Sequence, residues 1–234
     1  MTRRTKIVAT LGPATDQPGI LTTLVAAGAD VMRLNFSHGS HEDHARRAWL
    51  VKEAAAKLGR DIALVADLQG PKIRTESFAK GPIELKEGAS FILDTALGTH
   101  AGDETMVGCA YPDLPRDVKA GDTLLLNDGA LSLQITQVEG TRIHTRVLLG
   151  GMLSNRKGIN KLGGGLSAPA LTDKDKEDLR AAVKMGVDFI AVSFPRSAAD
   201  MQIARKLVQD AGGQAQLVAK IERAEALLCL DEII

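Results

Sequence analysis

Short apolar runs alternate with amphipathic segments over the first third of the chain. Three of these runs have the length and composition of buried strands: residues 6–10, 31–35 and 62–67. The segments between them predict two helices, one from an N-cap at Asp16 to Gly28 and one from a capping box at Ser40 to Gly59. Because strands that alternate with helices join through crossover connections, this part of the chain is expected to form a parallel sheet.

The pattern changes after Pro71. Apolar and polar positions then alternate with a period of two, as in residues 131–135, and turn signals such as Asn127-Asp128-Gly129 lie close together. No segment before Ala168 predicts a helix. We therefore expect an inserted β domain.

Alternation of helices and strands resumes after Pro169. The expected elements are a helix from the capping sequence at Thr172 to Gly186, strands at 189–193 and 216–220, and helices at 198–211 and from 224 onward. Five strands in an α/β unit fit either a doubly wound sheet or a (β/α)8 barrel, and periodicity alone leaves both open. The expected domain ranges are 1–70, 71–168 and 169–234.

Composition narrows the classes of function. The 234 residues are 44% hydrophobic and 25% charged, with 29 Lys and Arg against 29 Asp and Glu, so no net field favours nucleic acid or an anionic membrane. The two cysteines form no CxxC pair, which excludes a disulfide scaffold and a thiolate zinc site. No apolar run approaches the ~20 residues of a membrane span. A cytoplasmic location is expected.

Polar side chains interrupt the strands near their carboxyl ends. They are Arg33, Asn35 and Ser37 in the second strand, Asp67 at the end of the third with Lys72 and Arg74 just after it, and Lys220 and Glu222 at the end of the fifth. Each alone fits a structural role, such as an ion pair between Arg33 and Asp67. Together they would bring cations and carboxylates to one rim, which suits phosphate chemistry with Mg²⁺. We interpret His38, His41 and His44 as cap and surface residues.

Five segments carry a family resemblance in their order along the chain. They are KIVATLGPAT at 6–15, MRLNFSHG at 32–39, DLQGPKIRT at 67–75, KGIN at 157–160 and AKIE at 219–222. Together they closely resemble the N-terminal part of a pyruvate kinase. The resemblance implies an incomplete (β/α)8 TIM barrel of five strands, interrupted after the third by a β-rich lid (B) domain.

The resemblance also implies a reaction and its participants. Phosphoenolpyruvate and ADP would give pyruvate and ATP, with Mg²⁺ or Mn²⁺ as cofactor, in a homotetramer of the full-length enzyme with no nucleic-acid or membrane partner. The implied site residues are Lys220 for catalysis, Arg33 and Lys220 for substrate, Arg33, Asn35, Arg74 and Lys157 for nucleotide, Glu222 for Mg²⁺, and Asp128 in the lid.

A potassium pocket is a further implication of the family. Asn35, Ser37 and Asp67 match its ligands, but Leu68 replaces a threonine ligand and Lys72 stands where K⁺-dependent members have glutamate. A lysine ammonium is a fixed monovalent cation and could supply the charge that K⁺ otherwise brings. We expect K⁺ not to be required.

The chain stops inside the helix that follows the fifth strand, whereas a closed barrel needs eight strands. We expect this piece alone to lack part of the active site and to be inactive. Two alternative hypotheses for the function remain. The protein could be a Mg²⁺-dependent lyase or aldolase on a pyruvate-enolate barrel, which would need no nucleotide, or a non-catalytic truncation product.

Overall fold

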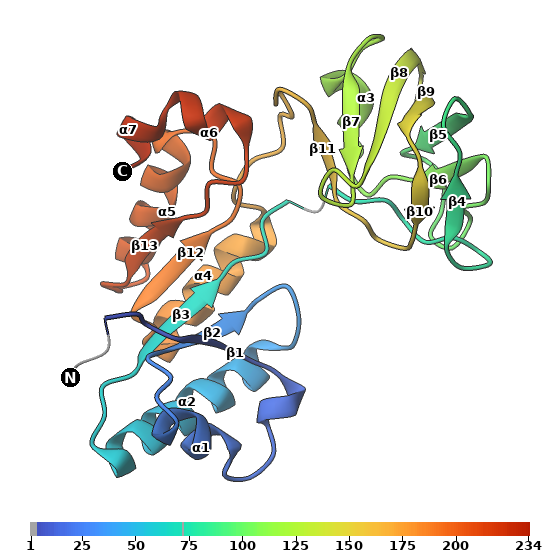
Figure 1. Cartoon of the computed structure of the whole chain (residues 1–234). Coiled ribbons are helices and arrows are strands. Elements are labelled where there is room, and N and C mark those ends of the chain that lie inside the picture. The colour runs from blue at the N-terminus through green and yellow to red at the C-terminus, as the bar shows by residue number, and fades with distance from the viewer. Residues whose placement is uncertain (1–3, 72) are drawn as a thin grey trace. The chain divides into compact units, whose positions relative to one another are not determined.

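The computed structural model describes residues 4–71 and 73–234. The chain divides into two compact units. The first, here called the sheet–helix unit, comprises Met1–Pro71 and Pro169–Ile234, and the second, the inserted unit, comprises Lys72–Ala168. Figure 1 shows both units.

The sheet–helix unit contains one sheet of five parallel strands. They are β1 (Val8–Leu11), β2 (Val31–Asn35), β3 (Ala63–Asp67), β12 (Phe189–Val192) and β13 (Gln216–Ala219). Their order in the sheet, β1-β2-β3-β12-β13, is their order in the chain, and every neighbouring pair is parallel. The prediction of an α/β fold with a parallel sheet is confirmed.

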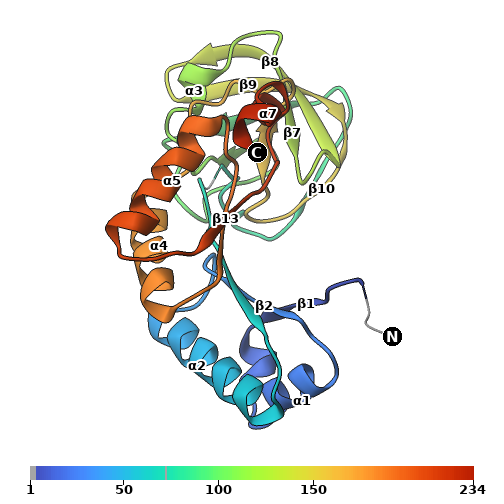
Figure 2. The ribbon, with the colours of Figure 1, turned by 90° about the vertical axis from the view of Figure 1, so that its left-hand side faces the viewer.

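Helices connect these strands or, in the case of α6 and α7, follow the last of them. They are the 3-10 helix η1 (Pro13–Thr15), α1 (Ile20–Ala26), α2 (His41–Leu58), α4 (Asp173–Met185), α5 (Ala198–Asp210), α6 (Ala224–Leu228) and α7 (Leu230–Ile233). Figure 2 shows α2, α4 and α5 along one side of the sheet. Their apolar faces and the strands form one core, which includes Met32, Leu34, Leu64, Leu179 and Ile190. This packing fixes the carboxyl ends of the strands relative to one another.

Two helices begin where their capping sequences predict. In α2 the Ser40 side chain accepts from the Asp43 N–H, and the Asp43 side chain reaches back to the Ser40 backbone. Thr172 and Asp175 make the same box at the start of α4. Both helices end at a glycine with left-handed backbone, so these predicted boundaries are confirmed.

The predicted start of α1 is wrong. The helix begins at Ile20 after Gly19, not after Asp16. The Asp16 carboxylate instead receives two hydrogen bonds from Arg47 of α2, at 2.8 and 2.6 Å. A bidentate guanidinium contact is stronger than a cap bond and draws the carboxylate away from the helix start.

The inserted unit is built mainly from antiparallel strands around its own core. A six-stranded sheet has the order β11-β7-β8-β9-β5-β6, and β10 pairs with β4. The strands are β4 (Ile83–Leu85), β5 (Ser90–Asp94), β6 (Met106–Gly108), β7 (Thr123–Leu126), β8 (Leu131–Glu139), β9 (Arg142–Leu149), β10 (Gly151–Leu153) and β11 (Ile159–Lys161). One short helix, α3 (Leu114–Asp117), corrects the expectation of no helix, since Asp113-Leu114-Pro115 favours a helical turn. Among the described residues, no helix combines the length and apolar character needed to cross a membrane.

Candidate active site

Two predicted residues meet at the carboxyl ends of β2 and β3. The Nε and Nη2 atoms of Arg33 each lie 2.7 Å from Oδ2 of Asp67. Arg33 also donates from Nη1 to the Thr10 hydroxyl at 3.0 Å. Asp67 is buried, whereas the Arg33 side chain is 31% exposed. The guanidinium is therefore oriented by the protein and still open to an anion at the rim.

Lys220 joins this pair from the end of β13. Its Nζ lies 3.2 Å from Oδ1 of Asp67 and 3.3 Å from Oε1 of Glu222. The Lys220 side chain is 30% exposed. The structure thus brings together the Arg33, Asp67, Lys220 and Glu222 side chains that the sequence predicts from three separate strands. Two cations held by carboxylates at one rim can bind and polarise a phosphoryl group.

Ser193 is a residue of this cluster that the sequence analysis did not single out. It follows β12, is buried, accepts a hydrogen bond from Lys220 Nζ at 2.9 Å and donates one to the Leu68 carbonyl at 2.7 Å. The next residue, Phe194, has φ = 56° and donates its N–H to Oε2 of Glu222 at 3.3 Å. The sequence contains the signal that would predict Ser193 as a site residue, because it is a polar residue at the carboxyl end of an apolar strand, as Asp67 is.

Asn35 is the last residue of β2, and Ser37 lies in the turn that follows it. Asn35 stands opposite Asp67 in the parallel register, and its Oδ1 accepts the Ser37 N–H at 3.1 Å. Within residues 4–71 and 73–234, Oδ1 of Asp67 is buried without a hydrogen-bond partner and faces only the Lys220 charge. Asn35 and Asp67 therefore lie side by side at the ends of neighbouring strands. Lys72, the predicted replacement for K⁺, lies outside the described residues.

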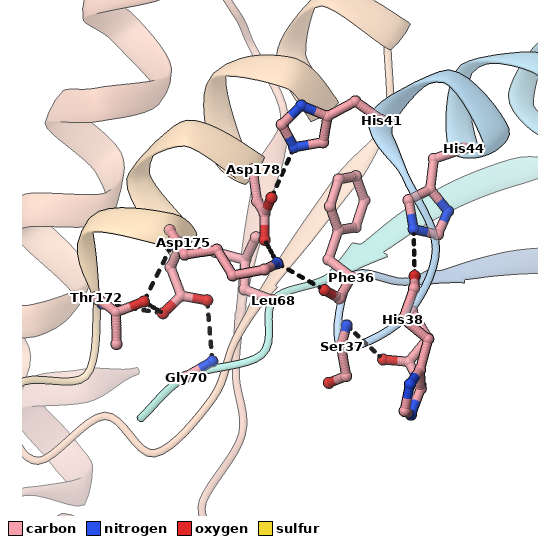
Figure 3. Close-up of polar contacts among 12 residues, drawn as sticks. Phe36, Ser37, His38, His41, His44, Leu68, Gly70, Thr172, Asp175 and Asp178 are labelled. Carbon is pink, nitrogen blue, oxygen red and sulfur yellow. Dashed lines mark hydrogen bonds and ion pairs between the residues drawn. The ribbon is translucent and has the colours of Figure 1, made fainter. Parts of the chain in front are cut away.

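The histidines after β2 are not all cap and surface residues, and Figure 3 shows the contacts that His41 and His44 make. His44 is buried, its ring stacks on Phe36 with centroids 4.4 Å apart, and its Nε2 lies 2.9 Å from the His38 carbonyl. Burial lowers the pKa of His44 below its ordinary value. His41 lies with Nε2 2.7 Å from Oδ1 of Asp178 on α4. The expectation is wrong for His44, because its ring packs on Phe36 and against the His38 carbonyl of the preceding turn.

Three other predicted residues belong to the inserted unit. Arg74 forms an isolated bridge with Gly158, and the residue after it, Thr75, donates its N–H to the Lys157 carbonyl at 2.8 Å. The turn that carries Asp128 adjoins the same place, since the Asn127 N–H donates to the Gly158 carbonyl at 3.0 Å. Arg74, Lys157 and Asp128, which are far apart in sequence, therefore gather at one end of this unit.

Glu222 is the carboxylate at this rim that could bind a divalent metal ion. Among the described residues, no cluster of three or more His, Cys, Asp or Glu side chains could hold a metal ion. Mg²⁺ needs no such cluster, because it is commonly held by one or two carboxylates together with substrate phosphates and water. Glu222, a single rim carboxylate 3.3 Å from the ammonium group of Lys220, fits that mode of binding.

Comparisons with known proteins agree on one family. Residues 2–234 match the family model described as "Pyruvate kinase, barrel domain". The chain is 56% identical to pyruvate kinase II of Salmonella typhimurium and 53% identical to a pyruvate kinase of Haemophilus influenzae, over 99% of this chain and 49% of each relative. It is 41% identical to a pyruvate kinase of Geobacillus stearothermophilus, over 100% of this chain and 40% of that protein. The chain thus spans about half the length of most of these relatives. It belongs to the pyruvate kinase family.

Proposed function

We propose that the complete protein to which this chain belongs is a pyruvate kinase that converts phosphoenolpyruvate and ADP to pyruvate and ATP. The observation that carries the proposal is the cluster at the strand ends, in which Lys220 and Arg33 are both held against Asp67. Charge builds on the transferring phosphoryl group and on the enolate oxygen during this reaction. Fixed cations at that point stabilise the transition state more than the ground state.

Each cation has a distinct proposed role. Lys220 stabilises the phosphoryl group and the enolate oxygen, because Ser193, Asp67 and Glu222 hold its ammonium group in place. Arg33 binds phosphate oxygens with the face of its guanidinium group that Asp67 does not use. Asn35 completes the nucleotide side of this rim.

The cofactor proposal assigns Mg²⁺, or Mn²⁺, to Glu222. The ion would neutralise phosphate charge and orient the substrates when bound. For K⁺, we propose that the pocket of Asn35, Ser37 and Asp67 needs no ion, since Arg33 and Lys220 already lie against Asp67. Exchange of tetramethylammonium for K⁺ should leave the activity of the complete protein unchanged, and Lys72→Glu should create K⁺ dependence. A many-fold activation of the unmodified protein by K⁺ would contradict this.

The finer fold is also part of the proposal. We propose that the five-stranded sheet is part of a (β/α)8 barrel, because its strands follow in chain order, whereas a doubly wound sheet reverses order at its switch point. The expected ranges 1–70 and 169–234 would be the barrel and 71–168 its lid. Arg74, Lys157 and Asp128 would then serve the nucleotide, and the enzyme would be a cytoplasmic homotetramer.

The test is a lactate-dehydrogenase-coupled assay of the complete protein. Lys220→Ala should lower kcat by a factor of about 10³. Lys206→Ala, on the exposed face of α5, is the matched control and should retain full activity. Turnover that requires no ADP would favour a pyruvate-enolate lyase, and full activity of Lys220→Ala would refute the assigned role.

A further inference from the structure

A single buried carboxylate in the sheet–helix unit holds both ends of the connection to the inserted unit. Asp175, on the first turn of α4, is fully buried. Its Oδ1 accepts the Gly70 N–H at 2.9 Å, and its Oδ2 accepts the Thr172 N–H at 2.9 Å and the Thr172 hydroxyl at 2.5 Å. Gly70 lies just before the chain leaves this unit at Pro71, and Thr172 lies just after the chain returns at Pro169. Figure 3 shows the three residues together.

The capping box of α2 shows what helix capping alone requires. There, Oδ2 of Asp43 accepts both the N–H and the hydroxyl of its own cap residue, Ser40, while its Oδ1 lies 3.8 Å from Arg46 one turn along the same helix, and its side chain is 46% exposed. In α4, Oδ2 of Asp175 makes the equivalent capping bonds to Thr172. The other oxygen is free for Gly70, which is 105 residues away in the chain. Helix capping therefore explains one oxygen of Asp175 and leaves the contact with Gly70 as an additional feature.

The segment that Asp175 holds leads directly out of the candidate active site. Leu68 follows Asp67 and is fixed by the Ser193 hydroxyl at its carbonyl, 2.7 Å, and by the Ala191 carbonyl at its N–H, 3.0 Å. Gly70 has φ = 69°, and a Cβ on it would lie 2.9 Å from the Cβ of Ser193. In this backbone conformation the Gly70 N–H donates to Asp175. The path from Asp67 to Pro71 is thus held at Leu68 by Ser193 and at Gly70 by Asp175.

The same helix also holds the turn after β2. Lys174 donates from Nζ to the Phe36 carbonyl at 2.9 Å and pairs with Asp178. Asp178 is buried and contacts His41 at 2.7 Å. The first turns of α4 are therefore bonded to the loops that follow both β2 and β3.

We propose that Asp175 is a positioning residue for the phosphoryl transfer. It fixes Gly70 and Thr172, and through Gly70 it fixes the segment that carries Asp67 at one end and the inserted unit at the other. The kinetic part of this inference rests on the proposed function. Its structural part, the bond between Asp175 and Gly70, does not.

The test compares variants of the complete protein that remove different bonds. Asp175→Ala and Asp175→Ser both lose the reach to Gly70, and serine keeps a small polar side chain. Thr172→Ala removes a cap hydroxyl but leaves the Gly70 bond, and Asp173→Ala removes an exposed carboxylate of the same turn. Asp175→Asn keeps an oxygen that can accept from Gly70 and serves as the conservative rescue. The readouts are kcat, KM for each substrate, and hydrogen exchange of the Gly70 amide.

If Asp175 positions this segment, Asp175→Ala and Asp175→Ser should both lower kcat about tenfold relative to Thr172→Ala. The KM for phosphoenolpyruvate should change less than about twofold. The Gly70 amide should exchange at least about tenfold faster in them, and Asp175→Asn should restore most of kcat. Should Asp175→Ala fail to fold, Asp175→Ser decides. A folded Asp175→Ser protein with kcat and Gly70 exchange equal to those of Thr172→Ala would overturn the inference. Absence of phosphoryl transfer by the unmodified protein would refute the proposed function. Hydrogen exchange of the Gly70 amide would still test the bond between Asp175 and Gly70.

Discussion

The Ser193 hydroxyl accepts a hydrogen bond from Lys220 Nζ at 2.9 Å, and so the ammonium group of the proposed catalytic lysine is held by the residue that follows the neighbouring strand, β12. The same hydroxyl donates to the Leu68 carbonyl at 2.7 Å. Because the hydroxyl proton is committed to Leu68, the oxygen lone pairs face Lys220. The serine thus couples the position of Lys220 to the segment after β3.

We predict that Ser193→Ala lowers kcat of the complete protein about tenfold with little change in either KM, because Lys220 loses a fixed acceptor. The free energy of unfolding should fall by about 1–2 kcal/mol, since the buried Leu68 carbonyl loses its donor. Coupled assays and denaturant titration measure the two effects. Ser197→Ala is the control, because Ser197 makes no side-chain cap bond at the start of α5. Wild-type kcat in Ser193→Ala would show that Lys220 is positioned without the hydroxyl.

Local sequence signals predicted the elements whose ends are made by neighbouring residues. The capping boxes at Ser40 and Thr172 and the glycines that end their helices act within one turn of chain, so the sequence is sufficient to place them. The start of α1 was wrong for the opposite reason. Asp16 has the side chain of a good N-cap, but its partner Arg47 lies 31 residues away and is brought there by tertiary packing.

In the candidate site, too, some contacts are predictable from the local sequence and others depend on distant segments of the chain. Polar residues at strand ends predicted the meeting of Arg33, Asp67 and Lys220, because parallel strands collect their carboxyl ends at one edge. The second contact of Asp175 could not be predicted, since Asp43 has the same local pattern and makes no such bond. What distinguishes the two carboxylates is the chain segment that packs beside each of them.

A second prediction concerns Gly70. Gly70→Ala should destabilise the protein more than Gly59→Ala, although both residues have a left-handed backbone, with φ of 69° and 59°. At Gly59 a Cβ meets nothing within 4 Å, so the expected cost is the backbone strain alone, about 1 kcal/mol. At Gly70 the Cβ would also press on Ser193 and Phe194, which should add about 1–3 kcal/mol. Denaturant midpoints compare the two variants, and equal midpoints would contradict the close packing at Gly70.

A third prediction uses the ion pair of Asp16 and Arg47. The hydrogen bonds from Arg47 hold the pKa of Asp16 below its ordinary value. The stabilisation is therefore complete at pH values above the unfolded pKa of about 3.9 and is lost as the pH falls toward the lower folded value. Asp16→Asn should be about 1 kcal/mol less stable than wild type at pH 7, and the difference should shrink below about pH 4. The exposed Asp61→Asn provides the control, and a difference independent of pH would count against the ion pair.

The last prediction concerns the buried His44. Burial is the largest influence on this group and lowers its pKa, while the hydrogen bond to the His38 carbonyl acts in the opposite direction. Above the unfolded pKa of about 6.5 the ring is neutral in both states and causes no pH dependence. Below that pH the unfolded chain takes up a proton more readily than the folded protein, so stability is lost as the pH falls toward the folded pKa.

His44→Gln should therefore flatten the fall in unfolding free energy between pH 7 and pH 5, because glutamine can donate to the His38 carbonyl without binding a proton. The substitution also removes the ring that stacks on Phe36, so the variant should be less stable than wild type at pH 7. His100→Gln, at an exposed position of the inserted unit, should keep the wild-type pH profile. If the unfolding free energy of His44→Gln fell with pH in parallel with that of wild type, the acid sensitivity would arise from other groups. Burial of the neutral His44 ring would then add nothing to the loss of stability at low pH.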